Sequence, residues 1–358
     1  MKNTYKHLEN LYKPNYFKKI TGNPLFGYIV LIVILAAIQL LFMYTEGIVS
    51  LTVSRAICMT MIYTIAAMGL GVLLGLAGLA SLGTAAFIGV GAYVAGNIMK
   101  ALPMPFLVVL LGVTLIAVVL GVLVGFISLR VRGLHLMIIT LALAQILNEL
   151  FRTPNEFTGG PNGLTDVPFP KLLMLIQLNR ETVFFIILAV MLLLIILTLN
   201  LINSPTGRAM MAMSSSESLA QAMGVRLLKY RVLAFVIATV YAMIAGALYI
   251  SSLGAATPTT WTMLMSLNIL AAVILGGNAK PSSTIIGAFV IFCVDLAILK
   301  NIPFFIKYTT ASVIFSGILI VLIVVKYPGG LARLLQNTKN GIQKLAAKWR
   351  MYKYGPEN

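Results

Sequence analysis

The stretch NSPTGRAMMAMSSSESLAQAMGVRLLKYR, residues 203–231, is a polar and basic interruption between two strongly apolar stretches, residues 183–202 and 232–253. Hydrophobic residues make up 60% of the chain and charged residues 10%, and the mean hydropathy is +0.99. These values lie far from the composition of a soluble globular domain. We therefore interpret residues 203–231 as a loop between two spans of a polytopic membrane protein.

A short helix is predicted inside this loop. Ser214 and Glu217 have the spacing of a capping box, in which the Ser214 hydroxyl accepts from the Glu217 amide and the carboxylate of Glu217 reaches back to the Ser214 amide. Good helix formers follow, and Gly224 stands where a left-handed residue would end the helix. Its small alanine and serine side chains would offer a surface to another protein.

The apolar windows predict an all-α polytopic bundle. A bilayer core of about 30 Å takes roughly 20 apolar residues to cross, and the chain has about ten candidate windows. The third, eighth and ninth windows are short or rich in glycine, and the first is too long for the apolar region of a cleavable signal, so we expect it to stay as a helix. The windows are residues 25–44, 56–77, 84–99, 106–129, 133–151, 183–202, 232–253, 264–277, 283–299 and 309–325.

The distribution of charge predicts the topology. With a cytoplasmic N-terminus, 19 of the 26 lysines and arginines fall inside and 7 outside, so the net charge of +17 needs no nucleic acid partner. A membrane domain of residues 25–326 would then have cytoplasmic tails, residues 1–24 and 327–358. Loop 203–231 is predicted to be cytoplasmic and residues 153–180 external. The basic, amphipathic C-terminal tail either lies on the anionic leaflet of the bilayer or serves as a plain topology signal.

Enzyme chemistry is poorly represented in the chain. The nearest approach to a phosphate-binding loop, GGNAKPSS from Gly276, has proline where such a loop needs lysine and serine or threonine, so we expect no ATP hydrolysis by this chain alone. Cys58 and Cys293 lie in apolar windows, and the histidines are His7 and His135. We expect no metal, no cofactor, no disulfide and no catalytic residues.

One acid, Asp295, falls clearly inside a predicted span. In an ion-coupled transporter such a group would bind the coupling ion. We favour a structural role, with Asp295 near Lys300 or bonded to a neighbouring helix, because the other acids near the spans, such as Glu149, fall at or beyond external helix ends and offer no partner carboxylate.

Residues 75–96, GLAGLASLGTAAFIGVGAYVAG, are too rich in glycine for one ordinary membrane helix. Two interpretations stand side by side: close packing of helices, or a broken helix that lines a solute path. Gln145 and Asn148, about one turn apart, either face the same path or bond a neighbouring helix. The candidate residues for the path or its gate are Gly78, Ser81, Gly83, Gln145 and Asn148.

The stretch FTGGPNGLTDVPFP, residues 157–170, is dense in turn formers. We expect an ordered, nonhelical cap over the ends of the spans, which serves as a docking surface or gate for an external partner. The candidate docking residues are Thr158, Gly159, Gly160, Asn162 and Gly163.

Seven segments together resemble the permease subunit of branched-chain amino acid ABC importers, the LivM-like type, which also includes urea and amide importer permeases. They occur in the order of that family along nearly the whole chain after the first span: GLAGLASLGTAAFIGVGAYVAG, LRVRGLHLMIITLALAQI, TGGPNGL, SPTGRAMMAMSSSESLAQAMGV, LAFVIATVYAMIAGALY, LNILAAVILGG and YPGGL. The resemblance implies an all-helical permease of the bacterial plasma (inner) membrane. It also implies a second, similar permease subunit, two ABC ATPase subunits and an external solute-binding protein as partners.

In this family the cytoplasmic loop docks a short helix into a cleft of the ATPase. Relatives usually carry Arg-Glu-Asn where this chain has Ser214, Ser215 and Ser216, and a histidine or similar polar residue near Thr84. Positions that match the loop motif are Gly207, Arg208, Glu217, Ala220 and Gly224, and Ser214 and Leu219 complete the candidate coupling residues.

The resemblance implies translocation of branched-chain or other hydrophobic amino acids by alternating access. A urea, amide or nucleoside importer permease is the alternative within the class. An ion-coupled secondary transporter is a more distant one, and a membrane-embedded enzyme the weakest.

Overall fold

The computed structural model describes residues 24–44, 48–101, 104–128, 133–170, 180–277, 280–298 and 317–318. The chain divides into two units, Met1–Glu46 and Gly47–Asn358. In the first unit the described element is the apolar helix α3 (Pro24–Tyr44). The predicted tails, apart from Pro24, and nearly all of the tenth window lie outside the described residues.

The second unit is helical, as the sequence predicts. Its long helices are α4 (Ile48–Gly71), α5 (Thr84–Ala101), α6 (Phe106–Ser128), α7 (Leu134–Arg152), α8 (Arg180–Asn203) and α11 (Leu227–Leu253). The shorter ones are α9 (Pro205–Ser215), α10 (Glu217–Ala222), α12 (Met263–Gly276) and α13 (Pro281–Ala288). Two π-helices, η1 (Val72–Leu76) and η4 (Phe289–Ile298), extend α4 and α13, and two 3₁₀ turns, η2 (Gly160–Asn162) and η3 (Pro258–Thr260), lie in connections.

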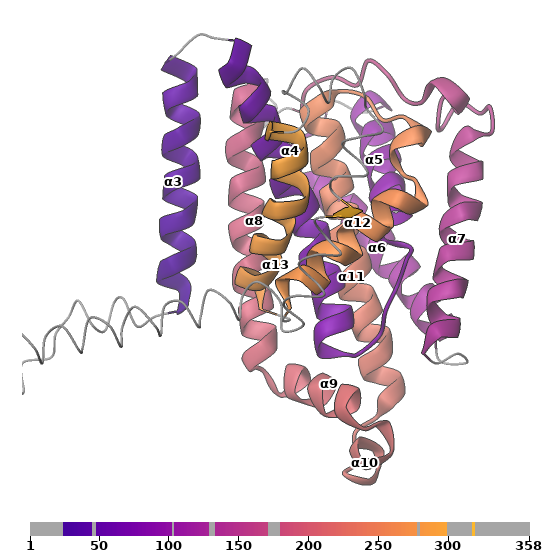
Figure 1. The fold of residues 1–358 in the computed structure, drawn as a ribbon. Coiled ribbons are helices and arrows are strands. Elements are labelled where there is room, and N and C mark those ends of the chain that lie inside the picture. The colour runs from indigo at the N-terminus through magenta and orange to yellow at the C-terminus, as the bar shows by residue number, and fades with distance from the viewer. Residues whose placement is uncertain are drawn as a thin grey trace, which may run out of the picture. The chain divides into compact units, whose positions relative to one another are not determined.

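The predicted windows coincide with these helices, except for the tenth. Within the described residues, five helices are long and apolar enough to cross a membrane: Val53–Leu76, Phe106–Ser128, His135–Arg152, Thr182–Asn203 and Leu227–Leu253. At about 1.5 Å per residue, the 14 residues of α12 span about 21 Å, less than a bilayer core of about 30 Å. In Figure 1, α12 lies at an intermediate height instead of running from end to end. The predicted number of ten crossings therefore stays a prediction.

The core of the second unit is built around α5 and α11. Helix α5 is buried on almost every side, and α11 also packs against α4 and α6. Gly246 of α11 lies so close to α5 that a Cβ there would come within 2.7 Å of the Ala92 amide nitrogen. Small residues at such positions let helix backbones touch, which is the packing mode expected in a membrane protein.

The glycine-rich stretch does not form one continuous helix, as predicted. Helix α4 ends in the π-helix η1, and residues 77–83 are nonhelical before α5 begins at Thr84. Gly78, with φ of +69°, takes a left-handed conformation in this break. Residues 77–83 break the helix, whereas the α5 part of the stretch packs closely against α11. That the break lines a solute path stays a prediction.

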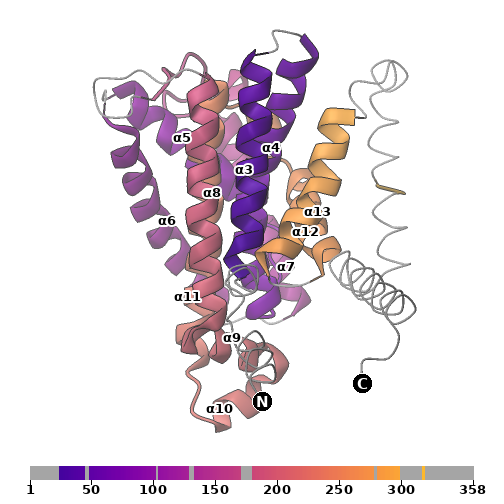
Figure 2. The same cartoon turned by 90° about the vertical axis from the view of Figure 1, so that its left-hand side faces the viewer.

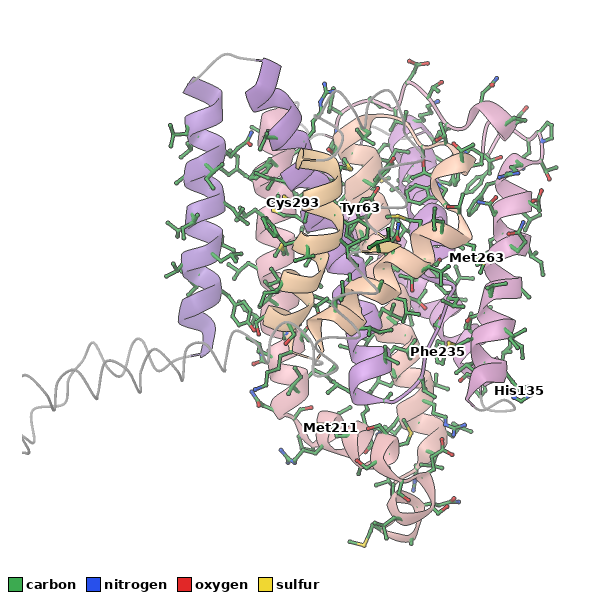
Figure 3. All side chains as sticks on the ribbon, viewed as in Figure 1. Tyr63, His135, Met211, Phe235, Met263 and Cys293 are labelled. Carbon is green, nitrogen blue, oxygen red and sulfur yellow. The ribbon has the colours of Figure 1, made fainter. Side chains whose placement is uncertain are left out.

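The basic loop and residues 153–170 lie at opposite ends of the second unit. Figures 1 and 2 show α9 and α10 at one end, and Figure 1 shows residues 153–170, which follow α7, at the other. In Figure 3, Met211 of α9 and His135 of α7 both lie at the lower end. Which end faces the cytoplasm stays a prediction from the charge distribution.

Candidate functional site

The basic loop forms two helices where the sequence predicts one. Ser204 caps the first, α9, by accepting from the Gly207 amide at 3.1 Å, and Pro205 occupies its first position. This Ser-Pro pair is the signal that sequence reasoning missed. A Cβ at Gly207 would lie 3.0 Å from the Ile202 carbonyl oxygen, so glycine lets α9 turn tightly against the end of α8.

The predicted capping box at Ser214 is wrong. Ser214 lies inside the last turn of α9 and its hydroxyl donates to the Met211 carbonyl at 3.0 Å, because α9 continues through Ser215. Helix α10 begins two residues later than the capping box requires. Its cap is Ser216, whose hydroxyl accepts from the Leu219 amide at 3.3 Å.

The predicted end of the loop helix at Gly224 is confirmed for α10. Gly224 has φ of +83° and follows the last residues of α10. Its amide donates to the Gln221 carbonyl at 3.0 Å, and the Val225 amide donates to the Ala220 carbonyl at 3.0 Å. These two bonds form a Schellman motif, which glycine favours at the left-handed position.

Glu217 binds a partner that the sequence did not identify. Its carboxylate forms an ion pair with Nη2 of Arg231 in α11. The side chain of Arg231 is 4% exposed and that of Glu217 is 31% exposed. A buried guanidinium needs such a partner, so the pair attaches α10 to α11.

Several large apolar side chains of the loop are exposed. Leu219 is 67% exposed and Met223 80% exposed, and Met211 and Leu228 are also exposed. Leu219 and Met223 are one helical turn apart, and neighbouring exposed apolar side chains are typical of protein interaction sites. Of the predicted coupling residues, Arg208, Ser214, Leu219 and Gly224 are exposed, Glu217 is half-buried, and Gly207 and Ala220 are buried.

The broken helix touches this loop. A Cβ added at Gly78 would lie 3.0 Å from Cβ of Ser214 and 3.3 Å from its Cα. Sequence reasoning placed these residues in two separate sites, a gate and a coupling loop. The structure brings them together at the same end of the second unit.

Side chains of other helices satisfy the backbone of the break. The Leu82 amide donates to the Thr140 hydroxyl of α7 at 3.0 Å, and the Ala85 amide donates to the Ser266 hydroxyl of α12 at 3.1 Å. Ser81, which is buried, accepts from the Gly83 amide at 3.2 Å. Buried nonhelical backbone requires such partners. Thr140 and Ser266 thus bond backbone amides at or next to the break, and no sequence motif marks them for that role.

Asn148 and Gln145 have different surroundings. The buried Asn148 amide donates to the carbonyls of Pro258 at 3.1 Å and Trp261 at 2.9 Å. The exposed Gln145 amide donates to Glu149 within the same helix at 3.1 Å. This geometry favours the second interpretation for Asn148, in which it bonds a neighbouring segment and holds η3 and Trp261 in place.

The predicted cap is ordered and nonhelical apart from η2. Leu164 and Ala256 exchange two backbone hydrogen bonds of 2.9 and 2.8 Å, which join the cap to the end of α11. Thr158 is buried and accepts, through its hydroxyl, from the Gly160 amide at 3.3 Å. The glycines at 159, 160 and 163 have positive φ, and a Cβ at Gly163 would lie 2.8 Å from Cα of Thr257. Most of the motif therefore builds the cap, whereas Asn162 is exposed.

Two expectations concern ions. Among the described residues, no three His, Cys, Asp or Glu side chains gather in a way that could hold a metal ion. Asp295 lies in η4, but its side chain and all of Lys300 lie outside the described part of the chain.

Comparison with known proteins gives consistent matches. A sequence model of the family described as "Branched-chain amino acid transport system / permease component" matches residues 52–324. The chain is similar to the high-affinity branched-chain amino acid transport system permease protein LivM of Salmonella typhimurium, with 32% identity over 298 residues, 76% of this chain and 68% of the relative. The Escherichia coli protein of that name is 31% identical over 331 residues, 85% of this chain and 75% of the relative.

A more distant match comes from an archaeon. A probable branched-chain amino acid transport permease protein LivM of Methanocaldococcus jannaschii is 26% identical over 321 residues, 75% of this chain and 90% of the relative. No solved structure gives a significant match.

Proposed function

The chain belongs to the permease family of branched-chain amino acid transport systems, and we propose that it moves branched-chain or other hydrophobic amino acids through the bacterial inner membrane. It is a multi-pass permease subunit of an ABC importer, whose ATPase activity belongs to other subunits. The observation that carries the proposal is the family match over residues 52–324, which includes the basic loop, the broken helix and the cap.

We propose that the complex contains a second permease subunit of the same kind, two ATPase subunits and an external solute-binding protein. The exposed apolar side chains of α9 and α10 support ATPase docking, because residues such as Leu219 and Met223 lose contact with water when a partner covers them. The cap, at the opposite end, is the proposed docking surface for the binding protein. Both tails and the loop would then lie in the cytoplasm.

Alternating access would be driven through the loop. Closure of the ATPase dimer would displace α9 and α10, and the Glu217–Arg231 pair would carry that displacement to α11. The contact between Ser214 and Gly78 would carry it to the break between α4 and α5. The second route reaches the break that contains Gly78, Ser81 and Gly83, and the first reaches α11, which packs against α5.

The test is ATP-dependent uptake of radiolabelled leucine by proteoliposomes that hold the complete complex and its binding protein. We expect uptake when ATP is supplied on the side of the membrane that carries the ATPases, and no uptake when the ATPases are omitted. Uptake of urea, an amide or a nucleoside in place of leucine would overturn the proposed substrate class. Uptake driven by an ion gradient without ATPases would overturn the class of transporter.

A further inference from the structure

Aromatic side chains from several elements meet inside the second unit. Tyr93 of α5 packs on Phe151 of α7 with ring centroids 4.8 Å apart, and Tyr249 of α11 meets Trp261 edge to face, also at 4.8 Å. Gly89 connects the two pairs, because a Cβ there would lie 2.8 Å from the Phe151 ring and 2.9 Å from the Trp261 ring. We call Tyr93, Phe151, Tyr249 and Trp261 the aromatic cluster.

Two polar atoms of this cluster are buried without a well-formed hydrogen bond. The hydroxyl of Tyr93 and Nε1 of Trp261 lie near each other, but neither meets hydrogen-bond geometry with any described residue, although Tyr93 is 0% exposed and Trp261 is 1% exposed. Buried N–H and O–H groups are almost always bonded, because an unpaired donor loses its hydrogen bond to water. By contrast, the buried hydroxyl of Tyr241 is 3.0 Å from the Thr198 hydroxyl and donates to the Leu194 carbonyl at 3.2 Å.

The cluster lies beside irregular backbone. Trp261 follows η3 and precedes α12, and Asn148 holds this connection through two carbonyl groups. Phe151 is the next-to-last residue of α7, and Tyr249 lies one turn before the end of α11, whose following residues bond the cap. The cluster therefore lies toward the cap end of the second unit. In a membrane protein, nonhelical backbone is tolerated where it is buried in protein or lines a path.

We propose that the Tyr93 hydroxyl and Trp261 Nε1 bind the carboxylate of an apolar amino acid as it passes through the permease, an inference that rests on the transport function proposed above. Two neutral donors suit an acceptor-rich group such as a carboxylate. The faces of Tyr249 and Trp261 suit its ammonium group, and the Phe151 ring suits its apolar side chain. The packed rings correspond to the closed state, and the solute would enter when they separate.

The experiment compares Tyr93→Phe and Trp261→Phe with Tyr241→Phe in the complete complex. Tyr241→Phe is the matched control, since it removes a buried tyrosine hydroxyl that has partners outside the cluster. Leucine uptake, ATP hydrolysis and thermal stability are measured on the same proteoliposome preparations. We expect both cluster variants to lower leucine uptake about tenfold while ATP hydrolysis and stability are retained, because each removes a donor that the solute carboxylate would use and that makes no well-formed hydrogen bond within the protein. The control should lose stability and keep its uptake.

The outcomes separate the two proposals. If the wild-type complex takes up no amino acid, the transport function fails. If the wild type transports leucine and both cluster variants transport it equally well, the carboxylate site fails and the transport function stands. A loss of stability in Tyr93→Phe as large as in Tyr241→Phe would also overturn the site, because the hydroxyl would then have a partner within the protein.

Discussion

Gly78 of the broken helix packs directly against Ser214 of α9, and a Cβ at Gly78 would come within 3.0 Å of the Ser214 Cβ. The two residues are far apart in the sequence, and one lies in the candidate gate while the other lies in the candidate coupling loop. Their contact makes the loop and the break neighbours, so a displacement of α9 acts on the chain between η1 and α5. This relationship gives the proposed coupling its most specific test.

Gly78→Ala is expected to weaken both folding and coupling. Its φ of +69° costs an alanine about 1–2 kcal/mol, and the added methyl would press on Ser214. Gly133→Ala is the matched control, because Gly133 has φ of +60° but no neighbouring atom within 4 Å. We expect Gly78→Ala to transport less leucine per ATP hydrolysed than Gly133→Ala. Equal ratios in the two variants would show that the contact carries no coupling.

Breaking the Glu217–Arg231 pair is expected to destabilise the loop. Glu217→Ala leaves a buried guanidinium without its carboxylate, which costs about 3–5 kcal/mol for a fully buried pair. We expect about 1–3 kcal/mol, because Glu217 is 31% exposed and water can replace part of the interaction. Thermal unfolding of the purified complex measures the loss.

A second substitution checks the cause of that loss. In Glu217→Ala/Arg231→Met no charge is left buried, so we expect the double variant to be more stable than Glu217→Ala alone. Arg231→Met is the second single variant of this comparison. If the double variant loses as much stability as the two single variants added together, the ion pair itself contributes nothing.

The exposed apolar residues of α10 are expected to determine ATPase binding. Leu219→Ser and Met223→Ser should each reduce recovery of the ATPase subunits with the purified permease about tenfold or more, as for central apolar contacts of an interface. Gln221→Ala is the control, since Gln221 is an exposed polar residue of the same helix. Retention of the full ATPase complement by both serine variants would place the docking surface elsewhere.

Asn148→Ala is expected to release the connection before α12. The variant loses two buried hydrogen bonds to the carbonyls of Pro258 and Trp261, at about 1 kcal/mol net for each, plus the cost of two unpaired carbonyl groups. Gln145→Ala, on the same helix, removes an exposed bond and should leave the melting temperature within about 1 °C of the wild type. If both variants melt alike, the Asn148 bonds do not hold the connection. If Gln145→Ala abolishes uptake, Gln145 lines the path.

The membrane topology can be read by cysteine labelling. Cys58 and Cys293 are both buried, so a new cysteine at an exposed site is the reactive one in intact cells. We expect a cysteine in place of Asn162 to react with a membrane-impermeant maleimide from outside. A cysteine in place of Gln221 should react only after the membrane is opened. The reverse pattern would invert the predicted orientation of the whole chain.

The sequence by itself determined the membrane class and most of the helices. Long apolar windows, the glycine-dense stretch and the turn formers of the cap are local patterns, and their consequences follow within a few residues along the chain. Gly224 shows this well, since a glycine after a short run of helix formers is enough to predict its left-handed conformation. The signal in Ser204 and Pro205 is equally local, and sequence reasoning overlooked it.

Only the tertiary structure decided which of these elements meet. The capping box failed because α9 continues past Ser214, and Glu217 pairs with Arg231, which the fold brings beside it. Asn148 bonds a connection more than a hundred residues later, and Tyr93 lies in one cluster with Trp261. Pairing, burial and missing partners depend on distances in space, and residue spacing along a chain fixes such distances only within a single helix or turn.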